Sequence, residues 1–181
     1  MTPLLVVGAG GFGRAVVDAA WAQGSWQPCG FIDDRGPALG SWCGLPVLGR
    51  LADLAQWRHL AGHVIVAIGD NKARVAIGAS LRQQNFQLAT VVHPRAWVSG
   101  HASLAEGTAV MAGAVVSTGV TVGRQVIINV GAVLDHDVTA GDGARLGAGA
   151  IAGGGSTLKA NAWLRDGGVL LAGHVLEADS A

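Results

Sequence analysis

A histidine flanked by two carboxylates is the group in this 181-residue sequence that is best suited to acid–base chemistry. Asp135, His136 and Asp137 are consecutive residues. A carboxylate beside an imidazole fixes its tautomer and stabilises the imidazolium, which suits a general base working near neutral pH. The competing interpretation is a solvated surface histidine without a role, so the surroundings of His136 decide between the two.

A glycine-rich segment near the N-terminus has the spacing of a phosphate-binding turn. Its glycines fit the pattern GxGxxG and stand between an apolar run at 4–7 and a segment with helical apolar spacing. Such a turn lets backbone N–H groups and a helix N-terminus approach a phosphate. Acids at the end of a second predicted strand, 27–32, could hold a ribose hydroxyl. The predicted nucleotide-binding residues are Gly8, Gly10, Gly11, Phe12, Gly13, Asp33, Asp34, Asp70 and Asn71.

These residues also have structural interpretations, which stay open. The glycines can serve only close packing of a strand on a helix, and Asp70 and Asn71 can cap the helix that follows them.

Strands and helices alternate as far as residue 93, which is typical of parallel βαβ units. We expect helices over 50–60 and 71–84 and strands over 64–68 and 88–92. A unit of this size equals one mononucleotide-binding half and is too small for the six-stranded dinucleotide fold. The sequence predicts a Rossmann-like α/β domain over residues 1–93 that binds a mononucleotide, with an NAD-binding module as the alternative.

The second half repeats with a period of six and without a slip. Every sixth residue from Val98 to Leu176 is aliphatic, and the residue four places later is small in nearly every repeat. Residues 98–181 form 14 such hexapeptides, each of which supplies one short strand, and three of them make one turn of the coil. The sequence predicts an all-β left-handed parallel β-helix over residues 94–181, whose weakly charged faces favour self-association.

This repeat places Gly154 directly above His136, one full turn later along the chain. A bare backbone N–H there could hold the oxyanion of an acyl-transfer intermediate, although the glycine can also merely fit a tight corner. Lys159 and Arg165 occupy outward positions of the last turns. They could bind phosphates or act as solubilising charges at the end of the coil.

The composition excludes several other classes of protein. Lys and Arg number 12, as do Asp and Glu, so no basic face for nucleic acid is expected. Two cysteines make no disulfide framework, and His59 with His63 lacks a third ligand, so we expect no metal site. No cation precedes the first apolar run, and the longest uncharged stretch, 107–123, carries regular Gly, Ser and Thr. We therefore expect a cytoplasmic protein without a membrane span.

Together these motifs resemble the PglD/NeuD-type sugar acetyltransferases. The resemblance covers essentially the whole chain and rests on residues 8–13, 31–34, 67–71, 92–94, 129–132 and 135–137. It implies an acetyl-CoA-dependent N- or O-acetyltransferase that acts on a UDP-linked amino sugar for surface glycan biosynthesis, as a homotrimer with acetyl-CoA between subunits. It implies His136 as the base, aided by Asp137, and Asn129 as a substrate ligand. We assign CoA binding to Arg145, Gly154, Lys159 and Arg165.

The sequence departs from this family at three places. Phe12 stands where the family usually has a histidine that points toward the sugar site, and Arg145 replaces another histidine of some members. The chain also ends at Ala181, before a Pro-containing tail that helps relatives bind CoA. The alternative from another functional class is therefore a trimer that binds a nucleotide sugar but is catalytically silent.

Overall fold

The computed structural model describes residues 1–178, which form two compact units, Met1–Ala89 and a second unit that begins at Thr90. The division falls just before the predicted boundary between residues 93 and 94. The end of the last hexapeptide, with Ser180 and Ala181, lies outside the described residues.

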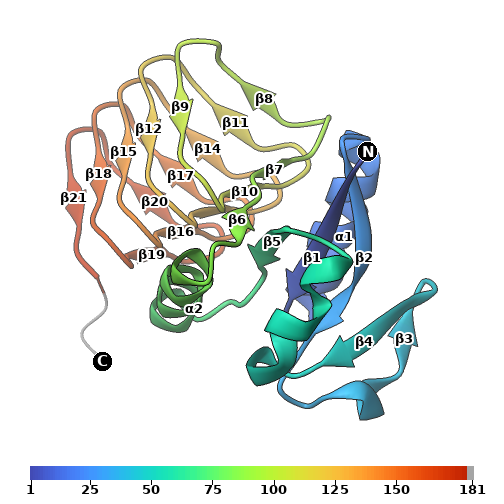
Figure 1. Ribbon diagram of the computed structural model, residues 1–181. Coiled ribbons are helices and arrows are strands. Elements are labelled where there is room, and N and C mark those ends of the chain that lie inside the picture. Colours follow the sequence, from blue (N-terminus) through green and yellow to red (C-terminus); the bar gives the residue numbers. More distant parts are fainter. Residues whose placement is uncertain (179–181) are drawn as a thin grey trace. The chain divides into compact units, whose positions relative to one another are not determined.

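The first unit is a sheet with helices on both faces (Figure 1). Its strand order is β3-β4-β2-β1-β5-β6, and all neighbouring strands run parallel except β3 and β4. In chain order the elements are β1 Thr2–Val7, α1 Gly11–Gln23, β2 Trp26–Ile32, the 3₁₀ helix η1 Pro37–Leu39, β3 Ser41–Trp42, β4 Leu45–Gly49, the 3₁₀ helix η2 Leu51–His59, β5 His63–Val66, α2 Asn71–Gln83 and β6 Gln87–Leu88.

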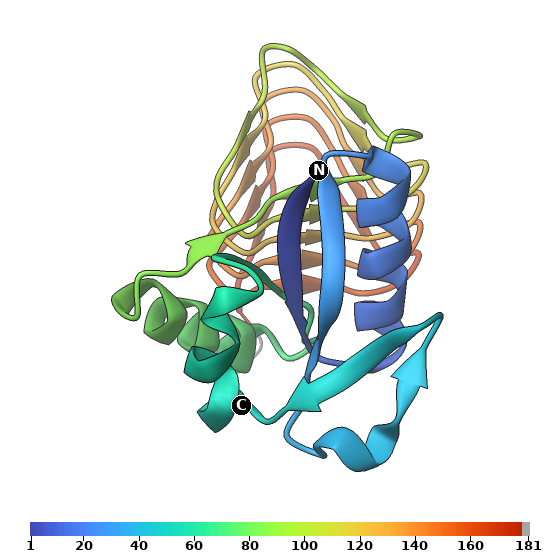
Figure 2. The same ribbon diagram turned by 45° about the vertical axis from the view of Figure 1, so that its right-hand side comes forward.

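Successive residues of β1 face opposite layers. Leu5 packs in one cluster with Leu54 of η2 and Leu81 of α2. Leu4 is equally buried on the other face, where α1 lies in Figure 2. Parallel strands that are covered on both faces must be apolar throughout. This burial explains the unbroken apolar run of β1, and it brings the carboxyl ends of β1, β2 and β5 to one edge of the sheet.

Residues 41–60 differ from the expected alternation of parallel strands and α-helices. Strands β3 and β4 form an antiparallel hairpin whose two turn residues, Cys43 and Gly44, both have positive φ, as a two-residue hairpin turn requires. The helix expected over 50–60 is the 3₁₀ helix η2. Only Leu54 of its residues is buried, so it has no apolar face at α-helical spacing.

The strand expected over 88–92 is divided between the two units. Ala89 N–H donates to Val64 of β5, whereas Val91 N–H donates to Thr108 of the second unit. The chain thus changes hydrogen-bonding partners between Ala89 and Val91, and Val91 begins the coil one hexapeptide earlier than expected.

The second unit is a left-handed parallel β-helix, which confirms the predicted fold. Figure 2 shows its turns stacked with a triangular outline. Its described strands form three five-stranded sheets, which we call the β7, β8 and β9 sheets after their first members. The strands are β7 Val91–Val92, β8 Trp97–Val98, β9 Ser103–Leu104, β10 Ala109–Val110, β11 Val115–Val116, β12 Thr121–Val122, β13 Ile127–Ile128, β14 Val133–Leu134, β15 Thr139–Ala140, β16 Arg145–Leu146, β17 Ile151–Ala152, β18 Thr157–Leu158, β19 Trp163–Leu164, β20 Val169–Leu170 and β21 Val175–Leu176.

The predicted repeat determines both the inside and the corners of the coil. The aliphatic residue of each hexapeptide packs in one continuous cluster inside it. From Gly107 to Gly173 every sixth residue has positive φ, and nine of these twelve corner residues are glycine. The exceptions are Gln125, Asp137 and Asn161. Because left-handed backbone favours glycine, a carboxylate at residue 137 is a departure from the corner rule.

Candidate active site

His136 lies at the corner of the coil between β14 and β15. Its Nδ1 lies 3.0 Å from Asp137 Oδ2, and its backbone N–H donates to Asp135 Oδ1 at 2.8 Å. An ionised carboxylate only accepts hydrogen bonds, so Nδ1 carries the proton and Nε2 keeps its lone pair. The imidazole is 59% exposed, so Nε2 is accessible to a substrate.

The two carboxylates change the acid–base behaviour of this imidazole. The hydrogen bond to Asp137 and then the charge of Asp135 raise the pKa of His136 above its ordinary value. Both groups stabilise the imidazolium, and Asp137 also orients the ring. An oriented ring with an exposed Nε2 is the arrangement that general-base chemistry needs.

Gly154 lies over the imidazole, as the period of the repeat predicts. A Cβ atom at residue 154 would lie 2.5 Å from His136 Nε2, so glycine is needed for the ring to keep its place. Gly155 N–H donates to the His136 carbonyl at 2.9 Å and fixes the spacing of the two corners. Within residues 1–178 the Gly154 N–H donates no hydrogen bond. The corner thus combines a base with a free backbone donor.

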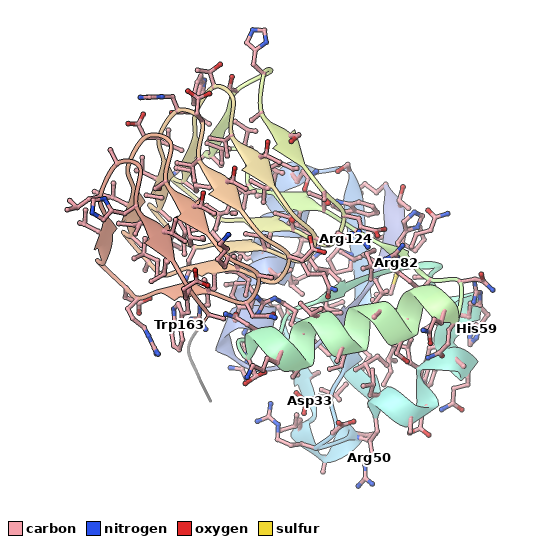
Figure 3. The ribbon with its side chains drawn as sticks, turned by 90° about the vertical axis from the view of Figure 1, so that its left-hand side faces the viewer. Asp33, Arg50, His59, Arg82, Arg124 and Trp163 are labelled. Carbon is pink, nitrogen blue, oxygen red and sulfur yellow. The ribbon has the colours of Figure 1, made fainter. Side chains whose placement is uncertain are left out.

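The remaining coil residues of the predicted site lie elsewhere on the coil. Asn129 follows β13, and its Oδ1 accepts the Val130 N–H at 2.9 Å. Arg145 and Arg165 each lie over the Trp163 ring, with guanidinium carbons 4.4 and 3.7 Å from its centroid, on the β7-sheet side of the coil (Figure 3). Lys159 follows β18 of the β9 sheet and lies at a different corner from Arg165.

The glycine turn of the first unit separates into packed and open positions. A Cβ at Gly8 would lie 2.7 Å from the Ala67 carbonyl oxygen, and one at Gly13 would lie 1.9 Å from the Gly8 carbonyl oxygen. Gly10 and Gly11 have nothing within 4 Å of such a Cβ. Gly10 is the N-cap of α1 and supplies no side-chain cap. Gly8 and Gly13 therefore serve packing, whereas the other two glycines leave the helix N-terminus open to an anion.

The acids at the carboxyl edge of the sheet hold the neighbouring backbone. Asp33 (Figure 3) accepts the Ala9 N–H at 2.9 Å and also binds the Arg35 guanidinium. The Arg35 hydrogen bond, with help from Ala9 and against partial burial, holds the pKa of Asp33 well below its usual range. Asp34 accepts the Leu51 N–H at the start of η2, at 2.9 Å.

The loop between β5 and α2 is held by a buried arginine that the sequence analysis missed. Asp70 caps α2 by accepting the Ala73 N–H at 2.7 Å. Arg74 is 1% exposed and donates to the Ile68 carbonyl and to Asn71 Oδ1, each at 2.8 Å. The structural interpretation of Asp70 as a helix cap is thus present in the molecule, and Asn71 binds a side chain of its own helix.

Comparison with known proteins assigns the family. Residues 3–81 match the family described as the PglD N-terminal domain. A GDP-perosamine N-acetyltransferase variant from Caulobacter crescentus, solved with CoA and GDP-perosamine, is 32% identical over 99% of this chain and 84% of its own, with a TM-score of 0.94. The chain belongs to the PglD-type sugar acetyltransferase family. The predictions of the family and of an acetyltransferase enzyme are therefore confirmed.

Other relatives of this PglD-type acetyltransferase agree in fold. The acetyltransferase domain of PglB from Neisseria gonorrhoeae FA1090, solved with acetyl coenzyme A, is 29% identical over 97% of this chain and 95% of its own, with a TM-score of 0.80. WeeI from Acinetobacter baumannii AYE, at 19% identity and a TM-score of 0.68, shares the fold. No curated protein matches the chain.

One contact near the predicted site residues of the PglD-type chain escaped the sequence analysis. Trp163 lies one turn of the coil after Arg145 and pairs with it in register, so the period could have revealed their contact. Among residues 1–178 no helix has the length and apolarity to cross a membrane, and no three His, Cys, Asp or Glu side chains form a group that could hold a metal ion.

Proposed function

We propose that the chain transfers the acetyl group of acetyl-CoA to the amino group of a nucleotide-linked amino sugar, with His136 as general base. The observation that carries this proposal is the corner at which His136 Nε2 lies against Gly154, whose N–H donates no hydrogen bond within residues 1–178. An N-acetyltransferase among the similar structures supports an amine acceptor, and a hydroxyl acceptor is the second candidate.

The base chemistry follows from the protonation states at this corner. An ammonium is not a nucleophile, so the acceptor first releases one proton to solvent and attacks as the free amine. Nε2 takes the second proton, which the nitrogen loses as the new C–N bond forms, while Asp137 keeps the ring in place and both carboxylates stabilise the imidazolium. The imidazolium can then return the proton to the departing thiolate. Acetyl-CoA supplies the activated carbonyl carbon.

Gly154 suits the other half of the reaction. Negative charge develops on the carbonyl oxygen when the amine attacks, and a backbone N–H fixed nearby stabilises it. Because residue 154 has no side chain, the imidazole can lie directly against the backbone that carries this N–H. The guanidinium groups of Arg145 and Arg165, together with Lys159, are our proposed partners for the CoA phosphates.

The first unit supplies the proposed nucleotide site. The open positions Gly10 and Gly11 at the N-terminus of α1 suit a diphosphate, and Asn129 on the coil is our proposed sugar ligand. The resemblance in the sequence implies a uridine nucleotide. A guanosine nucleotide is the second candidate, because GDP-perosamine is bound in a similar structure. The cytoplasmic location expected from the sequence stays a prediction.

An apolar ladder on the coil supports a homotrimer. The outward residues of the β8 sheet pair in register across all five strands, and each is apolar: Trp97, Val115, Val133, Ile151 and Val169. Trp97 and Val169 are 56% and 59% exposed on the single chain. Burial of this face against a second copy would remove apolar area from water. His136 follows β14 of this sheet, so a neighbouring copy packed on this face would enclose one side of the corner that carries His136.

One set of measurements separates the three functional hypotheses. Calorimetry with UDP, GDP, NAD and CoA measures binding, and thiol release from acetyl-CoA in the presence of UDP- and GDP-linked amino sugars measures transfer. We expect a nucleoside diphosphate and CoA to bind and thiol release to require the amino sugar. Binding without any turnover would favour the silent trimer, and NAD binding that is tighter than either diphosphate would favour the NAD module.

A further inference from the structure

Asp137, which orients the His136 imidazole, lies over a glycine that precedes it by one turn of the coil. The Asp137 N–H donates to the Thr118 carbonyl at 3.0 Å and fixes the two corners against each other. A Cβ atom at Gly119 would overlap Asp137 Oδ1 and lie 3.3 Å from its Cγ. The carboxylate therefore occupies space that exists because residue 119 has no side chain.

Another carboxylate of the coil is held against the preceding turn in a different way. Asp142 Oδ1 accepts the N–H of Arg124, one turn earlier, at 2.8 Å. The equivalent N–H below Asp137 belongs to Gly119 and donates to the His101 carbonyl at 3.3 Å. Oδ1 of Asp137 accepts no hydrogen bond from the described part of the chain, residues 1–178. Packing over Gly119 thus takes the place of a hydrogen bond from the turn below.

Glycines therefore lie on both sides of the pair formed by His136 and Asp137. Gly154 lies over the imidazole one turn later, and Gly119 lies under the carboxylate one turn earlier. The two side chains are 59% and 70% exposed on the single chain. Ordering of exposed side chains costs conformational entropy, which opposes an exposed ion pair. A recess that fits the carboxylate in the orientation of the pair lowers this cost.

We propose that Gly119 is a positioning residue for the general base, because its missing side chain lets Asp137 lie where Oδ2 meets His136 Nδ1. The inference rests on the proposed function only for the role of His136 in acetyl transfer. The contact between residue 119 and the carboxylate does not depend on that role. Gly119 acts through Asp137, so its replacement should change the properties of the imidazole first and the rate as a consequence.

Gly119→Ala is the direct test. The new methyl group would displace the end of an exposed, flexible side chain, so the fold should lose little beyond the cost of alanine at a positive φ. Gly113→Ala is the matched control for that cost. Its φ is 73° against 72° at Gly119, and the nearest atoms to a Cβ there are 3.8 Å away. Any larger effect of Gly119→Ala comes from the contact with Asp137.

The titration of His136 is the first measurement, by NMR of protein with labelled histidine and with His136→Ala to assign the signal. The Asp137 hydrogen bond is the main cause of the raised pKa of His136, so displacement of the carboxylate should lower that pKa. The acidic limb of the kcat/KM profile should then move to lower pH. Above that limb the rate should fall by about ten-fold, since the lost hydrogen bond is charged but exposed. Gly113→Ala should keep the wild-type pKa and rate.

A double variant separates positioning of the carboxylate from a general loss of structure. Asp137→Gly has no carboxylate to displace, so the addition of Gly119→Ala should leave both the pKa of His136 and the rate unchanged. A further loss larger than the one that Gly113→Ala adds, or an unchanged pKa of His136 in Gly119→Ala, would overturn this inference alone. A lowered pKa in Gly119→Ala, with no acetyl transfer by the wild type to any nucleotide-linked amino sugar, would support the inference and overturn the proposed function.

Discussion

The two units of this acetyltransferase position their functional groups by different means. In the coil, His136 and Gly154 meet because the rigid period of the repeat places one above the other. In the first unit, the glycine turn is held by contacts with segments far away in the sequence: Gly8 against Ala67, and Ala9 against Asp33. A local repeat sets the geometry of the first site, whereas tertiary packing sets the geometry of the second.

This difference has a consequence for how substitutions act. A coil corner is supported by strand pairing above and below, so a change in an outward side chain alters chemistry and leaves the fold in place. The glycine turn has no such redundancy, because its conformation depends on close approach of backbone to backbone. Substitutions of outward side chains in the coil should therefore change activity without changing stability. Substitutions in the glycine turn of the first unit should change both.

The largest expected effect is on turnover, from His136→Ala. Removal of a general base typically lowers the rate by about 10²–10⁴-fold. The affinity for the nucleotide should change little, because its proposed site is in the other unit, and the exposed side chain contributes little to the fold. Steady-state kinetics with calorimetry on the same preparation measures both. Near-normal turnover of the best acceptor by this variant would remove His136 from the mechanism.

The next effect is on stability, from Gly13→Ala. The new methyl group would lie 1.9 Å from the Gly8 carbonyl oxygen, which is backbone and cannot move aside. We expect the first unit to lose about 3 kcal/mol of unfolding free energy, at the upper end of overpacking costs. Gly11→Ala, in the same turn with nothing within 4 Å, is the matched control and should be neutral or stabilising. Denaturant titration followed by circular dichroism compares them, and equal midpoints would contradict the packing argument.

A smaller loss of activity, without loss of fold, is expected from Gly154→Ala. Its Cβ would displace the His136 imidazole, and a shift of about 1 Å in a catalytic group can cost about 10²-fold in rate. Gly100 occupies the same position of the coil three turns earlier and has open space around it. Gly100→Ala should therefore keep full activity. Similar rates for the two alanine variants would show that residue 154 does not position the base.

The sequence was sufficient for the coil because its information is periodic. The stacking of Gly154 on His136 followed from counting one full turn of the repeat, and the same count would have placed Trp163 on Arg145. Repeats that each form one strand leave little freedom in register. The fold, the family and the enzyme class were accordingly predicted and confirmed.

The same reasoning could not reach the contacts of the first unit. The type of hairpin turn at Cys43 and Gly44 lacks the Asn-Gly or Asp-Gly signal, and so the antiparallel strand that carries Trp42 was missed. The buried Arg74 is one charged residue in an otherwise ordinary helix, and no side-chain pattern reports its hydrogen bond to the Ile68 backbone carbonyl. Asp33 was expected to bind ribose, whereas the contacts that the structure shows for it are with Ala9 and Arg35.

The smallest effect, and the one with the clearest signature, concerns pH. Asp137→Asn removes a charge but keeps a side chain that tolerates the positive φ of 60° at this corner and can still accept from Nδ1. Because the Asp137 hydrogen bond is the main reason for the raised pKa of His136, that pKa should fall in the variant. Neutral base then persists to lower pH, so the acidic limb of the kcat/KM profile moves to lower pH.

At higher pH the same variant should be slower by about ten-fold, since its imidazolium is less stabilised in the transition state and the pair is exposed to solvent. Asp137→Gly introduces the residue that nine of the twelve corners carry, so this variant should fold at least as well as the wild type. It should lose both the orientation of the His136 imidazole and the negative charge beside it. Asp142→Asn, a carboxylate on the same coil that caps the Arg124 N–H, is the control for general charge effects. An acidic limb that stays in place in Asp137→Asn and moves in Asp142→Asn would show that the base is not tuned by its neighbouring carboxylate.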